Sequence, residues 1–512
     1  MTRRKSIKEL LKTAATITIF SIMTKTMGFF FRVYLSRMLG AEMMGVYQVA
    51  FSVFIVFLVM VTSGIPITVT SLTTRAQFDR NINQNSTVSA AVIINLIIGV
   101  GTVLIVLFFR PMWQKIFTNP ISFGILIFLM PAVIFSSVGD SFKGNIWGKK
   151  RYFTVSFIEL IEQTVRILLC IILFLFTSNS IMRANLAAIS LSLACAASSL
   201  TMIFYYYKLG GKTSPSDGHI RRVFEMSAPI TVMRVCSALV SFLIAVIIPN
   251  RLIASGLSGS QAMTVYGSSV GMSMGFLYSP ITLTGALAVA LVPRLNEEYE
   301  CKNLVCLGNT AKNALSFSIM TASVFVPLYL VMGSEIGQFI FNNHLSGVFL
   351  MRAAIVIIAL TIEHITSSMM NSMGLQYKEF INYIIGTALL IIIIWFFTPI
   401  MGINALILGL GVSNTVSAVL HIYQIKKLTS MKLDFLKTLG LNVAFMIPSC
   451  ALTLVLKSLL KNVPDFVSFL VCACTAIISI IILNICFGLL DLSAFFAYKK
   501  RKKSKRFLPE KK

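Results

Sequence analysis

Residues 86–109, which read STVSAAVIINLIIGVGTVLIVLFF, form an apolar run that contains no charged side chain. A helix needs about 20 predominantly apolar residues to cross a bilayer. A strand of a membrane barrel needs only about 10 residues and alternates apolar with polar positions, a pattern that this run lacks. The run therefore predicts a transmembrane helix.

Runs of this kind recur along the whole chain of 512 residues. Fourteen candidate spans lie near 13–31, 44–69, 86–109, 120–141, 152–176, 184–207, 223–249, 263–292, 313–332, 353–373, 380–397, 401–423, 438–456 and 466–490. Hydrophobic residues make up 56% and charged residues only 12% of the sequence, whereas soluble domains are about 25% charged. We therefore expect an all-α, polytopic membrane protein and exclude a string of soluble domains.

The net charge of +26 reflects 44 Lys and Arg residues against 18 Asp and Glu residues. With fourteen spans, both termini lie on one side, and the termini and loops of that side hold 32 of the 44 basic residues. Because cytoplasmic loops are enriched in Lys and Arg, we expect both termini in the cytoplasm. The basic tail around Lys499–Lys503 is expected to contact anionic lipids. No motif supports nucleic acid as a partner.

Two sequence matches suggest that a six-helix unit occurs twice. Tyr47 and Tyr266 each lie 15 residues beyond an arginine that ends an apolar run. The segments Asn145–Gly148 and Asn371–Gly374 match at an offset of 226 residues. Two six-helix copies have the same orientation, as in transporters built from parallel repeats. Chance recurrence of these residue types is the alternative.

The repeat predicts two pseudo-symmetric six-helix lobes followed by two further helices. The expected segments are a basic cytoplasmic N-terminus (1–12), an N-lobe (13–207), a cytoplasmic linker (208–222), a C-lobe (223–423), a two-helix appendage (424–490) and a basic cytoplasmic tail (491–512).

Several ionisable residues fall inside the predicted spans. An ionisable group at this depth costs several kcal/mol unless it faces a partner or a water-filled cavity. Lys25 and Arg234 lie near the middle of the first helix of each half. Facing a shared cavity, these two cations would attract an anionic substrate.

Glu159, Glu162 and Arg166 share one helical face, because they are spaced by three and four residues. This face predicts either an internal ion pair between Glu162 and Arg166 or a coupling site. Glu363, near the middle of a later span, is likewise either a proton or cation coupling site or a partner for Arg234 or Lys25.

No enzyme motif is present in the sequence. A nucleotide-binding Gly-x-x-x-x-Gly-Lys-Ser/Thr is absent, and the four histidines are scattered, so no metal site is expected. The predicted loops, about 20 residues at most, are too short for a catalytic domain. We expect a monomeric transport protein without a cofactor, driven by Na⁺, H⁺ or the membrane potential.

Two groups of motifs resemble one known family. The first comprises Thr24–Phe29, Arg32, Leu39–Glu42 and Gly45–Gln48, and the second comprises Ser227–Ile230, Arg234, Tyr266-Gly267, Gly271-Met272 and Leu291–Leu295. They resemble the first two helices and the seventh and eighth helices of the stage V sporulation protein B family. This family is related to MurJ-type lipid II flippases and to oligosaccharide flippases of the multidrug/oligosaccharidyl-lipid/polysaccharide (MOP) exporter superfamily.

The resemblance implies two six-helix lobes plus two helices, and a flippase for undecaprenyl-diphosphate-linked oligosaccharide in the bacterial cytoplasmic membrane. It implies that Lys25 and Arg32 match basic positions of the first helix that attract the diphosphate. Lipid II flippases carry a further arginine in the eighth helix, which is missing here, so Arg234 is expected to replace it.

Two other functions stay open at this point. A cation-coupled multidrug exporter of the same superfamily would have a net acidic cavity. A membrane scaffold that recruits cell-wall synthesis proteins would support growth even without transport.

Overall fold

The computed structural model describes residues 2–79, 83–215, 218–429, 435–460, 463 and 465–489, and every regular element within them is helical. Among these described residues, ten helices are long and apolar enough to cross a membrane. The number rises to eleven if the bent pair His344–Ala353 and Val356–Ser372 forms one span. The predicted all-α membrane architecture is confirmed, while the count of fourteen spans stays a prediction.

The difference between these counts has three visible causes. The span predicted near 263–292 is divided into the helical segments Gly259–Tyr266, Gly267–Ser273, Met274–Leu277 and Ser279–Glu300. Ile19–Arg75 forms one apolar stretch of 57 residues, which at about 1.5 Å per residue exceeds twice the thickness of a bilayer core. It is broken at Gly40, whose φ of 75° and ψ of 172° are not helical. The helix Tyr152–Phe174 carries three charged side chains, Glu159, Glu162 and Arg166, which lower its apolar character.

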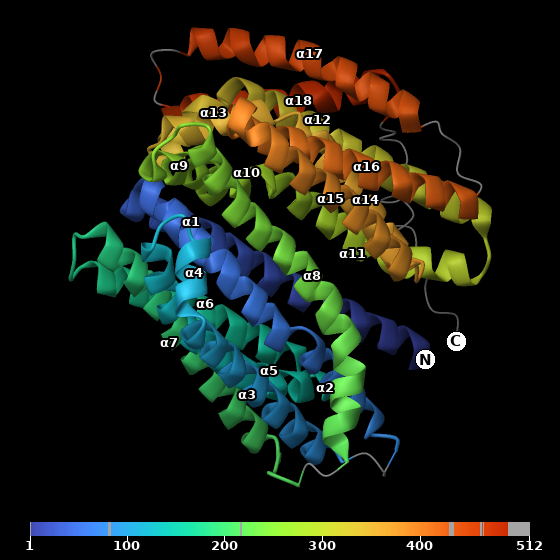
Figure 1. Ribbon diagram of the computed structural model, residues 1–512. Helices are drawn as coiled ribbons and strands as arrows, with labels where there is room; N and C mark the ends of the chain where they lie inside the picture. Colours follow the sequence, from blue (N-terminus) through green and yellow to red (C-terminus); the bar gives the residue numbers. More distant parts are fainter. Residues whose placement is uncertain are drawn as a thin grey trace, which may run out of the picture. The chain divides into compact units, whose positions relative to one another are not determined.

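The chain divides into two compact units (Figure 1). Unit 1 is Met1–Met272 with Ile394–Ile403, and unit 2 is Ser273–Ile393 with Asn404–Lys512. The helices of unit 1 are α1 (Thr2–Thr62), α2 (Gly64–Arg75), α3 (Gln84–Phe108), α4 (Arg110–Ile116), α5 (Ile121–Gly148), α6 (Tyr152–Phe174), α7 (Ser180–Lys208), α8 (His219–Ala254) and α9 (Gly259–Tyr266). A π-helical segment, η1 (Gly267–Ser273), ends at the boundary.

The core of unit 1 forms around α5, which packs against α1, α2, α3 and α7. Val69, Leu72, Ile146 and Tyr206 are buried in one cluster there. The approach is close because Gly144 of α5 has no room for a Cβ beside the backbone of Pro66 on α2. Small residues permit such close helix packing in membranes.

Unit 2 contains the second group of helices. They are α10 (Met274–Leu277), α11 (Ser279–Glu300), α12 (Leu304–Phe341), α13 (His344–Ala353), α14 (Val356–Ser372), α15 (Gln376–Met401), α16 (Asn404–Leu428), α17 (Phe435–Leu459) and α18 (Asp465–Cys486). The last residues of α15, from Ile394 onward, belong to unit 1. α12 packs against α11, α13, α14, α17 and α18, and is the central helix of this unit.

The two C-terminal helices are joined to α12 by polar contacts as well as apolar packing. Ser323 of α12 donates to Asn442 Oδ1 of α17 at 3.1 Å, and Asn484 of α18 donates to the same oxygen at 3.1 Å. Lys457 of α17 donates to the carbonyl of Val331 at 2.7 Å and pairs with Glu335 at 2.6 Å. These contacts fix the position of the appendage along α12.

Two predicted loops are wrong. Residues 32–43, expected to be a loop, are helical apart from the break at Gly40. The span predicted near 120–141 continues as α5 to Gly148, so the Asn145–Gly148 motif is helical and lies outside any loop. Helix propensity and packing extend both helices beyond the end of the apolar run.

The boundaries of the compact units differ from the boundaries of the predicted lobes. α8, expected to start the C-lobe at 223, packs against α1, α2 and α3 in unit 1. The lobes follow the internal repeat of the sequence, whereas the units follow packing, so the lobe boundaries stay a prediction. The predicted tail 491–512 lies outside the described residues.

Candidate functional site

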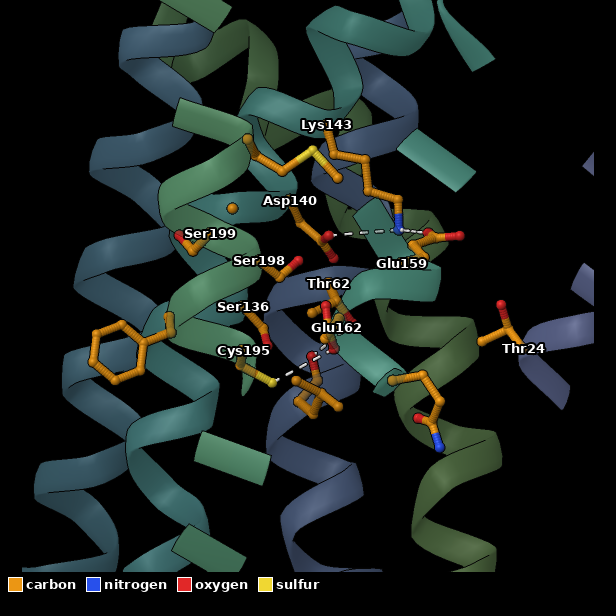
Figure 2. A pocket seen from close by; sticks show the side chains of 15 residues that line it. Thr24, Thr62, Ser136, Asp140, Lys143, Glu159, Glu162, Cys195, Ser198 and Ser199 are labelled. Carbon is orange, nitrogen blue, oxygen red and sulfur yellow. Dashed lines mark hydrogen bonds and ion pairs between the residues drawn. The ribbon is translucent and has the colours of Figure 1, made fainter. Parts of the chain in front are cut away.

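A polar cavity of about 310 Å³ lies inside unit 1, between α1, α5, α6 and α7 (Figure 2). Its charged lining consists of Asp140 and Lys143 from α5 with Glu159 and Glu162 from α6. Hydroxyl groups from α1 and α7, including Thr24, complete the polar wall. Three carboxylates and one ammonium group thus face a single cavity within a bundle of apolar helices.

Lys143 is the centre of this arrangement. Its Nζ lies 2.7 Å from Glu159 and 3.6 Å from Asp140. The Lys143 side chain is 17% exposed, the Asp140 side chain 20% and the Glu159 side chain 40%. The ammonium group also lies 4.8 Å from the centre of the Trp147 ring, one turn further along α5. Lys143 therefore offsets part of the negative charge of the site.

Glu162 faces the part of the cavity that is lined by α7. The thiol of Cys195 donates to Glu162 Oε1 at 3.7 Å (Figure 2). Arg166 instead lies with its guanidinium 4.7 Å from the ring centre of Phe31 on α1. Glu162 and Arg166 thus each contact a different partner.

Lys25 and Arg234 are both exposed side chains of unit 1. Lys25 lies on α1 and Arg234 on α8, two helices that pack against each other. Both stand in apolar stretches of the chain, where a cation needs water, a lipid phosphate or an anionic ligand.

Arg32 has a different environment from the other two predicted cations. Its Nε donates to the carbonyl of Gly271 at 2.6 Å, and its Nη2 donates to the carbonyl of Val270 at 2.6 Å. The guanidinium group is therefore engaged with the backbone of η1.

Glu363 lies on α14 in unit 2, where its side chain is partly buried. One turn along α14, Ser367 donates to the carboxylate of Glu379 on α15 at 2.8 Å. Thr366 forms a hydrogen bond of 3.2 Å with the ring of His421, a fully buried residue of α16. A second polar cluster thus lies among α14, α15 and α16.

Asp140 and Lys143 were missed in the sequence as site residues. Both residues lie at the end of an apolar run, where charged side chains usually indicate the membrane surface. The spacing of three residues is the available signal, because it places both side chains on one face if the helix continues.

Residues 10–283 match the model of a family described as polysaccharide biosynthesis protein. This match covers more than half of the chain. The chain belongs to the polysaccharide biosynthesis protein family. Its resemblance to stage V sporulation protein B, seen in the motifs, is confirmed by 22% identity to that protein from Bacillus subtilis (strain 168), over 79% of this chain and 81% of the relative.

Solved structures show the same fold for members of the superfamily. The lipid II flippase MurJ in an inward closed conformation aligns with a TM-score of 0.72 at 14% identity, covering 92% of this chain and 98% of that chain. An inward-facing multidrug resistance MATE family transporter of the MOP superfamily aligns with a TM-score of 0.66 at 16% identity. The alignment covers 81% of this chain and 98% of that chain. The MATE- and MOP-like fold is thereby confirmed, and the chain is an integral membrane protein.

Proposed function

We propose that the protein flips an undecaprenyl-diphosphate-linked oligosaccharide across the bacterial cytoplasmic membrane by alternating access. The cargo is a lipid II-like peptidoglycan precursor or another polysaccharide unit. Membership of the polysaccharide biosynthesis protein family supports this proposal. The observation that carries it is the pair of exposed cations, Lys25 and Arg234, on two apolar helices that pack together.

The chemistry of the cargo suits these two side chains. A diphosphate is a compact anion that cannot cross hydrocarbon without compensating positive charge. Lys25 supplies a point charge on a flexible stem, while Arg234 supplies a planar fork that binds phosphate oxygens in pairs.

Neutralising Lys25 or Arg234 is expected to slow flipping at least about tenfold, because a hydrogen bond to a charged group contributes about 1.5–3 kcal/mol. Lys25→Gln and Arg234→Gln are purified, reconstituted in liposomes and supplied with a fluorescent undecaprenyl-diphosphate oligosaccharide. Protection of the fluorophore from an impermeant quencher measures flipping. Lys115→Gln, which removes an exposed cation of α4, is the control and should flip at the wild-type rate. Wild-type rates for both Lys25→Gln and Arg234→Gln would refute the proposal.

We further propose that the cavity of unit 1 couples flipping to a proton or cation gradient. Its lining holds three carboxylates and one ammonium group, and the excess negative charge needs a proton or a cation when the cavity closes. Glu162 is the best candidate, since Lys143 pairs with the other two carboxylates.

Glu162→Gln is expected to remove the gradient dependence of flipping while slow, gradient-independent exchange persists. The measurement compares flipping with and without an imposed pH or Na⁺ gradient, and an ionophore that collapses the gradient. Glu225→Gln, which breaks the exposed pair with Arg221 at the start of α8, is the matched control and should stay gradient-dependent. Unchanged gradient dependence in Glu162→Gln would exclude this role.

The acidic lining also favours a second candidate function, a cation-coupled exporter of cationic compounds. A cavity of about 310 Å³ is at the lower end of the range for drug-sized ligands. Efflux of a cationic dye from proteoliposomes without any flipping of the lipid-linked oligosaccharide would favour this alternative.

A further inference from the structure

The chain first passes from unit 1 to unit 2 inside the π-helical segment η1, between Met272 and Ser273. It crosses between the units again on either side of Ile394–Ile403. π-Helical turns are rare and occur mostly where the backbone departs from regular geometry for a functional reason. The transition from α-helical to π-helical bonding shifts the register of the backbone hydrogen bonds. Carbonyl groups at such a transition are available to side-chain donors.

Arg32 binds the side of η1 that belongs to unit 1. Its two hydrogen bonds reach the carbonyls of Val270 and Gly271, both at 2.6 Å, across 238 and 239 residues of sequence. A guanidinium fork suits two adjacent acceptors, and charged donors form stronger hydrogen bonds than neutral ones. The backbone of η1 is thereby fastened to α1 up to Gly271.

Two glycines bring the same segment against the backbone of α1. A Cβ on Gly267 would collide with the carbonyl oxygen of Ala41 and would lie 2.6 Å from the backbone nitrogen of Gly45. A Cβ on Gly271 would lie 2.9 Å from Cγ of Met44. The two chain segments therefore contact each other over more than one helical turn.

The residues that follow are held by unit 2. The hydroxyl of Ser273 donates to the carbonyl of Ser346 at 2.6 Å, at the start of α13. Phe276 packs edge-on against Phe341 of α12, with ring centres 5.8 Å apart. Gly271 and Ser273 are thus anchored to different units, and only Met272 lies between them.

We propose that Gly271–Ser273 is a pivot for the movement of the two units, and that Arg32 is a positioning residue that holds its unit 1 side. This inference rests on the proposed alternating-access transport. The predicted role of Arg32 as a ligand of the diphosphate is replaced by a role in confining bending to three residues. Without Arg32, bending spreads into the rest of η1 and no longer moves the units as rigid bodies.

Amide hydrogen exchange of the full chain in lipid nanodiscs tests the anchor without any cargo. Arg32→Gln is expected to raise exchange in residues 265–273 at least about fivefold, with no change in α12. Arg32→Lys, which keeps the charge but loses the fork, should also raise it. Lys25→Gln, two helical turns earlier on α1, removes a cation from the same helix and should leave exchange in this segment unchanged.

Binding and flipping separate this role from cargo recognition. Fluorescent undecaprenyl diphosphate should bind Arg32→Gln and Arg32→Lys within threefold of the wild type, while both variants flip at least tenfold more slowly. Lys25→Gln should show the opposite, weak binding with normal exchange. Wild-type flipping by Arg32→Lys, or unchanged exchange in Arg32→Gln, would overturn the assignment.

A second pair of variants covers the case in which the Arg32 variants fail to fold. Gly267→Ala inserts a methyl group into the contact with α1 and is expected to raise exchange in η1. Gly259→Ala, at the start of the preceding helix α9, has open space around the added methyl group and is the matched control. It should leave exchange in η1 unchanged. If the wild type does not flip the lipid, the proposed cargo fails. The exchange results still show whether η1 is anchored to α1. Equal exchange of η1 in both glycine variants would refute this anchor.

Discussion

Replacing Lys143 by methionine is expected to destabilise unit 1 by roughly 3 kcal/mol and to abolish gradient-driven flipping. The change leaves Asp140, Glu159 and Glu162 in one cavity without a counter-charge. Removing one partner of a buried ion pair costs about 3–5 kcal/mol, and the lower end applies because Glu159 is 40% exposed. Thermal unfolding in detergent and the liposome assay provide the measurements.

Two companion variants test whether charge balance is the cause. Lys143→Met combined with Glu159→Gln should regain most of the lost stability, because it removes one of the unpaired carboxylates. Lys208→Met, at the exposed end of α7, should unfold at the wild-type temperature. A combined variant as unstable as Lys143→Met would show that the lysine acts through packing, including its contact with Trp147.

The second large effect is expected at Gly337, where α12 and α13 meet. A Cβ on Gly337 would collide with the backbone of Gly347, and Gly347 in turn packs against Gly333. Gly333 and Gly337 form a Gly-x-x-x-Gly pair, which lets helices approach to backbone contact. Gly337→Ala is expected to cost about 1–3 kcal/mol through overpacking.

Gly101→Ala is the matched control, since no heavy atom lies within 4 Å of a Cβ at that position. Alanine is a better helix former than glycine by about 1 kcal/mol, so this variant should be neutral or slightly more stable. Thermal unfolding of both variants in the same detergent gives the comparison. Equal unfolding temperatures would mean that α13 moves away from α12 at little cost.

Local sequence patterns predict which segments are helices because hydrocarbon admits only segments whose backbone is hydrogen-bonded internally. The same patterns predicted that Glu159 and Glu162 share a face, and both line the cavity of unit 1. The end of the apolar run did not mark the end of α5. Lys143 and Asp140 were therefore not recognised as parts of one site.

The partners of the charged residues depend on contacts distant in sequence. Spacing allowed either an ion pair between Glu162 and Arg166 or a coupling site, and it gave no sign that Phe31 of α1 provides an aromatic face for the guanidinium. Arg32 bonds to carbonyls more than 200 residues away. A sequence does not show which backbone carbonyl will accept a hydrogen bond, because every residue has the same main-chain carbonyl whatever its side chain.

The polar contacts between α12 and α17 have a consequence for how the protein is made. Lys457 and the carbonyl of Val331 that it binds are separated by 126 residues. During synthesis, Glu335 and Ser323 are therefore inserted long before Lys457 and Asn442 emerge from the ribosome. Until then α12 carries an uncompensated carboxylate in a lipid environment, which is a costly state. We therefore expect a chain truncated before α17 to leave the carboxylate of Glu335 without the counter-charge that Lys457 provides.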